Sequence, residues 1–197
     1  MDGINGRIAG RVRGLRRERR LTLDELAEKS GVSRSMISLV ERGRGNPTAT
    51  VLDKLAAGLA VTLASLFEDD AGAAASSPVS RRAAQAEWRD PGSGYVRRNL
   101  SPPGEPSPLQ LVEVHFPPGK RVAYDSAERD VEVHQQVWLI DGVMEVVVAS
   151  QKWRLQPGDC LAMRLDQPIA YRNPGRKPAR YLVALCSLAA HIPGRKS

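Results

Sequence analysis

Apolar residues recur every three or four positions along the first third of the chain, which is the period of an amphipathic helix. The first such segment runs from Asn5 to Arg19 and places Ile8, Val12 and Leu15 on one side. Two shorter helices follow between Leu23 and Arg42, a fourth begins at Thr48, and a fifth is capped by Thr62. The pattern therefore predicts five helices that enclose one apolar core.

The residues between Leu23 and Arg42 predict two helices joined by a tight turn. Gly31 stands where the chain reverses, since glycine tolerates a positive φ, and Ser33 is a suitable N-cap for the second helix. Ile37 and Val40 fix that helix on the core. At 100° per residue its opposite face carries a basic and polar set: Arg34, Ser35, Ser38, Leu39 and Arg42. A face of this kind fits a DNA major groove, and an ordinary buried helical hairpin is the alternative.

The chain changes character after this helical region. Small residues and a proline without large apolar side chains indicate a linker at residues 69–82. Prolines and glycines then separate short β-rich runs, with turn signals at Asp141-Gly142 and at Pro157-Gly158-Asp159, which favours a β-sandwich or barrel. The expected strands are Tyr95–Asn99, Leu109–Phe116, Val137–Ile140, Met144–Ala149, Lys152–Leu155, Cys160–Met163, Ile169–Arg172 and Tyr181–Cys186. We therefore predict a multidomain α plus β chain with an all-α domain at 1–68 and an all-β domain at 83–192.

Charge points to a polyanionic partner for the helical region. The 197-residue chain has a formal net charge of +7, and the first 45 residues hold eleven Lys and Arg against six acids. No apolar run reaches the roughly 18–20 residues that a membrane span needs, and the first residues lack the apolar segment of a signal peptide. We therefore expect a cytoplasmic protein in which Cys160 and Cys186 are buried free thiols.

The segments LRRERRLTLDELAEKSGVSRSMISLVERG and LDKLAAGLAVTLASLF resemble the five-helix DNA-binding domain of phage-type repressors, the xenobiotic-response-element family. The resemblance implies that Arg16 pairs with Glu41 at the end of the recognition helix. It also implies base readout by the exposed face of that helix, with Arg34 as the best candidate for a guanine contact. Arg44 and Asn46 are expected to contact phosphates. The full set expected at DNA is Ser33, Arg34, Ser35, Ser38, Leu39, Arg42, Arg44, Asn46, Thr22 and Arg11.

The stretch VWLIDGVMEVVVASQKWRLQPGDCLAMRLDQPIAYRNPG resembles the cupin fold, a small jelly-roll barrel. Catalytic cupins hold a metal with three histidines and a glutamate. The corresponding positions here carry Glu128, Asp130, Gln135 and Ile169, so we expect neither a metal nor another cofactor, and no catalytic residues. An unrelated site that uses His134 with Glu132 or Asp130 stays open as an alternative.

A barrel without that metal site has room for another use. We expect its former metal end to bind a small organic effector, with a lining of Gln135, Arg164, Ile169 and Tyr171. The alternative is a barrel filled by its own side chains that only supports dimerisation. Trp138 and Trp153 are expected in the core.

These expectations describe a homodimeric transcriptional regulator of a bacterial type. Two recognition helices about 34–36 Å apart would read a pseudo-palindromic operator in double-stranded DNA, and the cupin-like domain would dimerise the protein and sense the effector. Two alternatives are a metal-dependent cupin enzyme with a DNA-binding appendage and an antitoxin-like protein that binds DNA only in complex with a partner.

Overall fold

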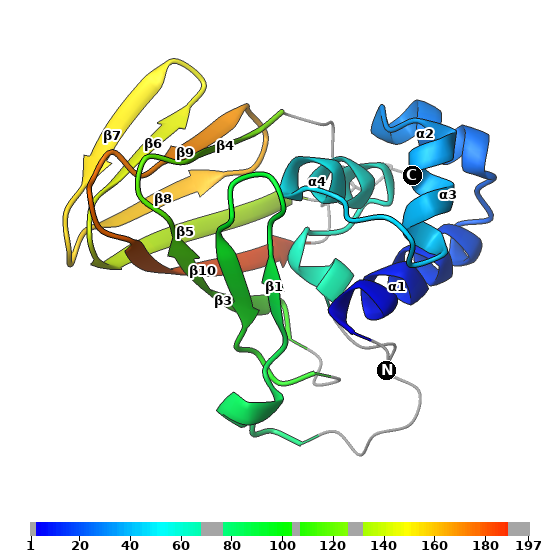
Figure 1. Cartoon of the computed structure of the whole chain (residues 1–197), viewed down its shortest axis with the longest axis horizontal. Coiled ribbons are helices and arrows are strands. Elements are labelled where there is room, and N and C mark those ends of the chain that lie inside the picture. The colour runs from blue at the N-terminus through cyan, green and yellow to red at the C-terminus, as the bar shows by residue number, and fades with distance from the viewer. Residues whose placement is uncertain (1–2, 68–76, 104–106, 126–131, 189–197) are drawn as a thin grey trace, which may run out of the picture.

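The computed structural model describes residues 3–67, 77–103, 107–125 and 132–188. The helices gather on one side of the molecule and the strands form a sandwich on the other, with the fourth helix between the sandwich and the remaining helices (Figure 1). None of the described helices has the length and apolar composition needed to cross a membrane.

The helical part contains four α-helices and a short 3₁₀ turn: α1 (Ile4–Glu18), α2 (Leu23–Ser30), α3 (Arg34–Glu41), α4 (Ala49–Gly58) and η1 (Ala64–Phe67). The expected fifth helix is therefore wrong in type, because only the four residues of η1 are helical in that described segment. Thr62 does act as the expected cap, since its Oγ1 accepts a hydrogen bond from Ser65 N at 3.1 Å.

The inner faces of these helices are the ones that the apolar period predicts. Ile8, Val12 and Leu15 of α1 are buried, and so are Ile37 and Val40 of α3. The chain reversal predicted at Gly31 is also confirmed, because this glycine has a φ of 64°, and Gly43 after α3 has a φ of 65°. Glycine adopts this left-handed conformation without steric cost.

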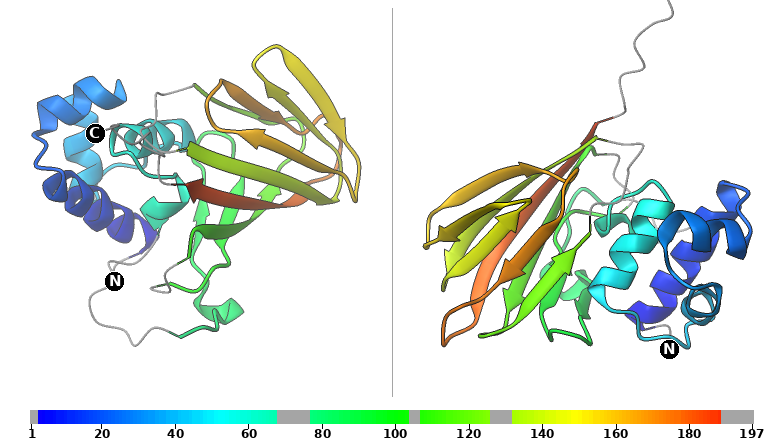
Figure 2. Two further views of the ribbon diagram at one scale, coloured as in Figure 1. Left: turned by 180° about the vertical axis from the view of Figure 1, so that it is seen from behind. Right: turned by 90° about the horizontal axis from the view of Figure 1, so that it is seen from above.

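The strands form two antiparallel sheets that face each other (Figure 2). The six-stranded sheet has the order β1-β2-β3-β10-β5-β8, and the four-stranded sheet has the order β4-β9-β6-β7. The first consists of β1 (Glu87–Arg89), β2 (Val96–Asn99), β3 (Leu109–Phe116), β10 (Ala179–Leu188), β5 (Glu132–Asp141) and β8 (Cys160–Arg164). The second consists of β4 (Arg121–Tyr124), β9 (Ile169–Arg172), β6 (Met144–Val148) and β7 (Gln151–Leu155). This is the expected cupin-like sandwich, and β1 and β4 are the strands that the sequence pattern did not reveal.

Both predicted turns are present, but the hairpin expected at Asp141-Gly142 is wrong, because each of the two turns links a strand of one sheet to a strand of the other. Gly142 joins β5 to β6 with a φ of 84°, and Gly158 lies between β7 and β8 with a φ of 96°. Gly142 also has no room for a side chain, since a Cβ there would lie 2.8 Å from Ala179 Cα. The close approach fixes where β5 turns away from β10.

The alternation of buried and exposed residues along β5 decides which side chains enter the sandwich. Gln135 and Val137 are buried, whereas the intervening outward positions are exposed. Trp138 lies on the outward phase and is 48% exposed, so its expected place in the core is wrong. Cys160, which pairs with Trp138 across β5 and β8, is also exposed rather than buried. Strand phase outweighs the apolar character of these two side chains.

An ion-pair cluster occupies the outer side of the six-stranded sheet. The buried Glu113 carboxylate accepts a hydrogen bond from Arg180 Nε at 2.7 Å and pairs with Arg98 Nη2 at 2.7 Å. Burial alone would raise the pKa of Glu113, but the two guanidinium groups outweigh it and leave that pKa below its ordinary value. The cluster ties β2, β3 and β10 together.

The helices and the sandwich share one continuous hydrophobic core. Phe67 of η1 packs against Trp88 of β1 with ring centroids 5.5 Å apart. The N-terminus of α4 is capped from the sandwich, since Ala49 N donates to Asp90 Oδ1 at 2.8 Å. Of the expected linker, residues 69–76 lie outside the described residues, and the later part leads into the short turn η2 (Arg82–Ala84).

Candidate nucleic-acid interface and effector pocket

The first helix of the helix-turn-helix unit starts at a complete capping box. Thr22 Oγ1 accepts from Glu25 N at 3.1 Å, and Glu25 Oε2 accepts in return from Thr22 N at 2.7 Å. The hydrogen bond from the Thr22 backbone also lowers the pKa of Glu25. The sequence predicts this arrangement, because Thr and Glu three residues apart satisfy two otherwise unpaired N–H groups. Thr22 is exposed, so it keeps a surface that a phosphate can reach.

The second helix, α3, begins at the predicted N-cap. Ser33 Oγ accepts from Met36 N at 3.3 Å and lies 3.2 Å from Ser35 Oγ. Ser33 thereby has a structural role at the start of α3 and remains exposed, as does Ser35. The helix N-terminus thus presents two hydroxyl groups to solvent.

The C-terminal end of α3 is held by α1 through the expected ion pair, which is confirmed. Arg16 donates from Nε to Glu41 Oε1 at 2.6 Å and from Nη2 to Glu41 Oε2 at 2.9 Å. Its Nη1 donates to the Leu21 carbonyl at 2.8 Å, and Arg13 donates to the Glu41 carbonyl. The hydrogen bond to Glu41 raises the pKa of Arg16. This bidentate pair fixes the direction of α3 relative to α1.

The outward face of α3 carries the side chains expected at base edges. Arg34 is exposed and pairs with Asp24 at 3.1 Å, with 65% and 76% of the two side chains accessible. Pairs this exposed contribute little stability, so Arg34 can exchange Asp24 for another partner at small cost. Leu39 is 38% exposed, so its aliphatic side chain is accessible on this face. Ser38 is half-buried, and its carbonyl accepts from Arg42 Nε at 3.1 Å.

Three further residues are expected at DNA. Two of them, Arg44 and Asn46, lie in the loop after α3, and the third, Arg11, belongs to α1. Arg44 and Asn46 are exposed beside the recognition helix. Arg11 instead donates from Nε to the Ser65 carbonyl in η1 at 3.3 Å. Arg11 and Arg13 are two residues apart and so about 200° apart around α1, and Arg13 is the one that reaches α3. The structure therefore places Arg11 on the η1 side of α1, and its expected contact with DNA stays a prediction.

A second candidate site is a pocket of about 90 Å³ inside the sandwich, at the side where α4 packs. Three of the four residues expected at an effector site line it: Gln135, Ile169 and Tyr171. Gln135 Nε2 donates to Tyr171 Oη at 2.5 Å. Arg164 does not line the pocket. It is exposed and pairs with Glu132 and Asp166 at 3.3 Å each, because it occupies an outward position of β8.

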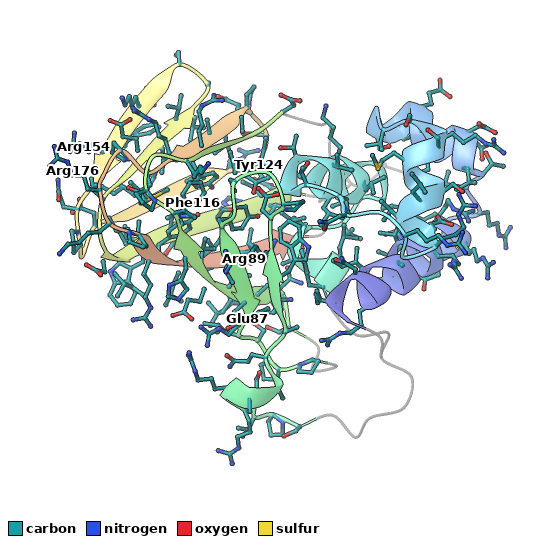
Figure 3. All side chains as sticks on the ribbon, viewed as in Figure 1. Glu87, Arg89, Phe116, Tyr124, Arg154 and Arg176 are labelled. Carbon is teal, nitrogen blue, oxygen red and sulfur yellow. The ribbon has the colours of Figure 1, made fainter. Side chains whose placement is uncertain are left out.

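The pocket also contains polar groups that the sequence pattern did not single out. Tyr95, Tyr124 and Tyr181 line it, and the hydroxyls of Tyr95 and Tyr124 lie 3.2 Å apart. Burial raises the pKa of Tyr124 and of Tyr181 well above the ordinary value, so both hydroxyls remain neutral donors. Figure 3 shows Tyr124 at the junction between the sandwich and α4.

Arg97 is the cation in the pocket lining, and sequence reasoning missed it. Arg97 is 5% exposed, and the central carbon of its guanidinium lies 4.4 Å from the centre of the Phe67 ring. Burial lowers the pKa of Arg97. The neighbouring Arg98 points to the other side of β2, and nothing in the segment Val96–Asn99 tells which of two consecutive arginines turns inward.

The described residues contain no group of three or more His, Cys, Asp or Glu side chains that could hold a metal ion. His134 and Glu132 lie 3.1 Å apart, and both are exposed. Glu128 and Asp130, which stand at two of the positions of the catalytic cupin pattern, lie outside the described residues.

Comparisons with known proteins agree with this architecture. A family described as helix-turn-helix matches residues 12–66. Over 183 residues the chain is 26% identical to the HTH-type transcriptional regulator SutR of Escherichia coli (strain K12), and this alignment covers 92% of this chain and 95% of SutR. It is 33% identical over 70 residues to the control protein C.MunI of Mycoplasma sp, covering 35% of this chain and 95% of that protein. It is 38% identical to SinR of Bacillus subtilis (strain 168), but that match spans only 57% of SinR.

A solved structure extends the likeness in fold to the whole chain. The crystal structure of an HTH_3 family transcriptional regulator from Vibrio cholerae superposes with a TM-score of 0.73. The alignment covers 93% of this chain and 96% of that one, at 24% sequence identity. The combination of helices and β-sandwich described above therefore occurs in another protein.

Proposed function

Since the chain belongs to the helix-turn-helix family, we propose that the protein is a sequence-specific, DNA-binding transcriptional regulator. The observation that carries the proposal is the exposed face of α3. The buried Arg16–Glu41 pair and the core residues Ile37 and Val40 fix this helix, yet its outward side chains stay accessible. A rigid, exposed and polar helix is what direct readout in a major groove requires.

Each accessible side chain has a role in this proposal. Arg34 donates in bidentate fashion to a guanine once Asp24 releases it, and Leu39 contacts a thymine methyl group. Ser33, Ser35 and Ser38 offer hydroxyl groups to base edges and phosphates. Thr22, Arg42, Arg44 and Asn46 position the protein on the phosphate backbone.

We propose that two copies act together. A homodimer with recognition helices about 34–36 Å apart would match a pseudo-palindromic operator in double-stranded DNA. In this proposal residues 1–68 form the DNA-binding domain and residues 83–192 the cupin-like domain, which supports dimerisation. A regulator that binds the chromosome would act in the cytoplasm.

The sandwich is proposed as a sensor and not as a catalyst. Gln135 and Ile169 stand where catalytic cupins carry a glutamate and a histidine, and both side chains line the pocket together with four tyrosines. An amide and an aliphatic group are poor metal ligands but suitable walls for an organic molecule. A small effector in this pocket would shift the population of dimers whose recognition helices match the operator.

The test is a binding titration with DNA selected by the protein from a random pool. We expect a two-fold symmetric site, and we expect Arg34→Ala to lose about 1–3 kcal/mol on it while tolerating other bases at one position of each half-site. Arg176→Ala is the matched control, because this exposed arginine lies at the end of the sandwich remote from the helices (Figure 3). It removes the same charge and should leave binding unchanged.

Two results would count against the proposal. If Arg34→Ala weakens binding to every sequence equally, Arg34 contacts phosphate only and the base readout assigned to it is wrong. If the purified protein selects no DNA at all, the antitoxin-like alternative gains, in which a partner protein is needed for binding. Stoichiometric metal in the purified protein would favour the enzyme alternative.

A further inference from the structure

The pocket in the sandwich is built jointly by the two halves of the molecule. Most of its lining comes from strands, but Asp53 of α4 and Leu63 before η1 also line it. Phe67 of η1 lies beneath the guanidinium of Arg97, which belongs to the same lining. The helical part therefore contributes to the walls of this pocket together with the sandwich.

Arg97 is a buried cation with one donor, its Nε–H, left without a hydrogen-bond acceptor. Its Nε has no hydrogen-bond partner in the structure, although the residue is only 5% exposed. The polar groups around it are the hydroxyls of Tyr95, Tyr124 and Tyr181 and the carboxylate of Asp53. A buried charge normally has a partner, because an unpaired one strongly destabilises the fold. Arginine stays charged in proteins, so an anion is the acceptor that best suits the unbonded Nε–H.

The rest of the lining restricts the body of that anion. Phe116, Val183 and Ile169 supply apolar surface, while Gln135 and the neutral tyrosine hydroxyls supply a few donors. The lining also has two carboxylates, Asp53 and Asp125, and Asp125 is paired with Lys54 at 3.1 Å. The volume of about 90 Å³ is smaller than the roughly 150 Å³ cavity that accommodates benzene. A planar carboxylate matches the fork of a guanidinium, and a short alkyl chain matches the walls.

We propose that this pocket binds a short-chain carboxylate of about four or five non-hydrogen atoms, with its carboxylate on Arg97. The expected effect on DNA binding rests on the proposed function, whereas the binding of the carboxylate does not. The bound carboxylate pairs with the same guanidinium that stacks on Phe67. Binding in the pocket therefore changes the contact that holds the helical part on the sandwich. DNA affinity then depends on the carboxylate.

The binding test uses the full chain without DNA, with acetate and propionate as ligands and propionamide as the uncharged analogue of propionate. We expect propionate to raise the midpoint of thermal unfolding by about 3–6 °C at ten times its dissociation constant. Propionamide at the same concentration should not raise it. Equal shifts with propionate and propionamide, or no shift with either carboxylate, would overturn the proposal.

Two arginine variants locate the site. Arg97→Met should abolish the propionate shift and leave the midpoint of the unliganded protein no lower than in the wild type, because it removes a buried and incompletely paired charge. Arg121→Met alters an exposed arginine of β4 and should keep the full shift. A propionate shift that survives in Arg97→Met would place the carboxylate elsewhere. If Arg97→Met does not fold, Arg97→Lys is titrated instead, with a loss of at least tenfold in affinity expected, since ammonium lacks the fork.

DNA titrations with and without propionate then separate the two proposals. Binding of operator DNA in the absence of any carboxylate tests the proposed function alone. A change in operator affinity of at least threefold on adding propionate, absent in Arg97→Met, is expected from the coupling through Phe67. Thermal shifts without any change in DNA affinity would leave the pocket assigned but contradict the coupling.

Discussion

The ion pair between Arg16 and Glu41 allows a quantitative test of how α1 holds the recognition helix. The two side chains are 14% and 8% exposed and share two hydrogen bonds of 2.6 and 2.9 Å. Replacing Glu41 with methionine removes both acceptors and leaves the Arg16 guanidinium enclosed with one remaining bond to the Leu21 carbonyl. Breaking one side of a buried pair costs about 3–5 kcal/mol, and the residual exposure of Arg16 brings the expected loss to about 2–4 kcal/mol.

The double variant tests whether the loss in Glu41→Met comes from the unpaired charge of Arg16. Replacing both Arg16 and Glu41 with methionine removes the unpaired charge, so the free energy of unfolding should return to within about 1 kcal/mol of the wild type. The two single losses therefore should not add, and the interaction energy of the double-mutant cycle should be about 2 kcal/mol or more. Urea unfolding monitored by circular dichroism measures all four proteins.

The exposed pair between Arg34 and Asp24 is the internal control, because it also joins an arginine to a carboxylate at 3.1 Å but in solvent. Asp24→Ala should change the free energy of unfolding by less than about 1 kcal/mol. The reasoning is refuted if Glu41→Met costs no more than Asp24→Ala, or if the losses of the two single methionine variants are additive.

Three further predictions concern other parts of the structure. Asp90→Ala leaves Ala49 N without its acceptor, while Thr48 still caps Val51 N, so urea unfolding should show a loss of about 1–3 kcal/mol. Gly58→Ala, which normally favours a helix, should destabilise here by about 1–2 kcal/mol in the same assay, because its Cβ would lie 2.9 Å from Ser30 Cβ; a gain would contradict the close packing of α2 and α4. The pKa of Glu113 is lowered in the folded protein, so its ionised form stabilises the fold above about pH 4.3. This contribution is lost as the pH falls through the lowered pKa. The midpoint of thermal unfolding should therefore drop less steeply between about pH 5 and pH 3 in Glu113→Gln than in the wild type.

Local patterns in the sequence predict much of the helical part. The capping box at Thr22, the reversal at Gly31 and the inward placement of Ile37 depend on residues a few positions apart, and the structure has all three. The turn at Gly142 is local in the same sense, although it links the two sheets and does not close a hairpin. These features follow from backbone geometry and periodicity, which a sequence displays directly.

Features that depend on distant contacts were not predictable in this way. Arg97 enters the pocket only because of the register of β2, and the cap that Asp90 places on Ala49 joins residues 41 positions apart. Trp138 shows the opposite error, since its size suggested burial while the phase of β5 turns it outward. Arg164 was expected at the pocket, but the alternation of side chains along β8 turns it outward, and the sequence does not show which phase that strand adopts.

The packing of Phe67 on Trp88 limits how this molecule can be rearranged by engineers. A reporter made by transplanting only the helical head onto an unrelated sensor would carry an aromatic surface with nothing to cover it, and the graft would tend to aggregate. A usable chimera would have to carry β1 and its loop along with the helices, so that the seam between old and new sequence falls farther into the sandwich.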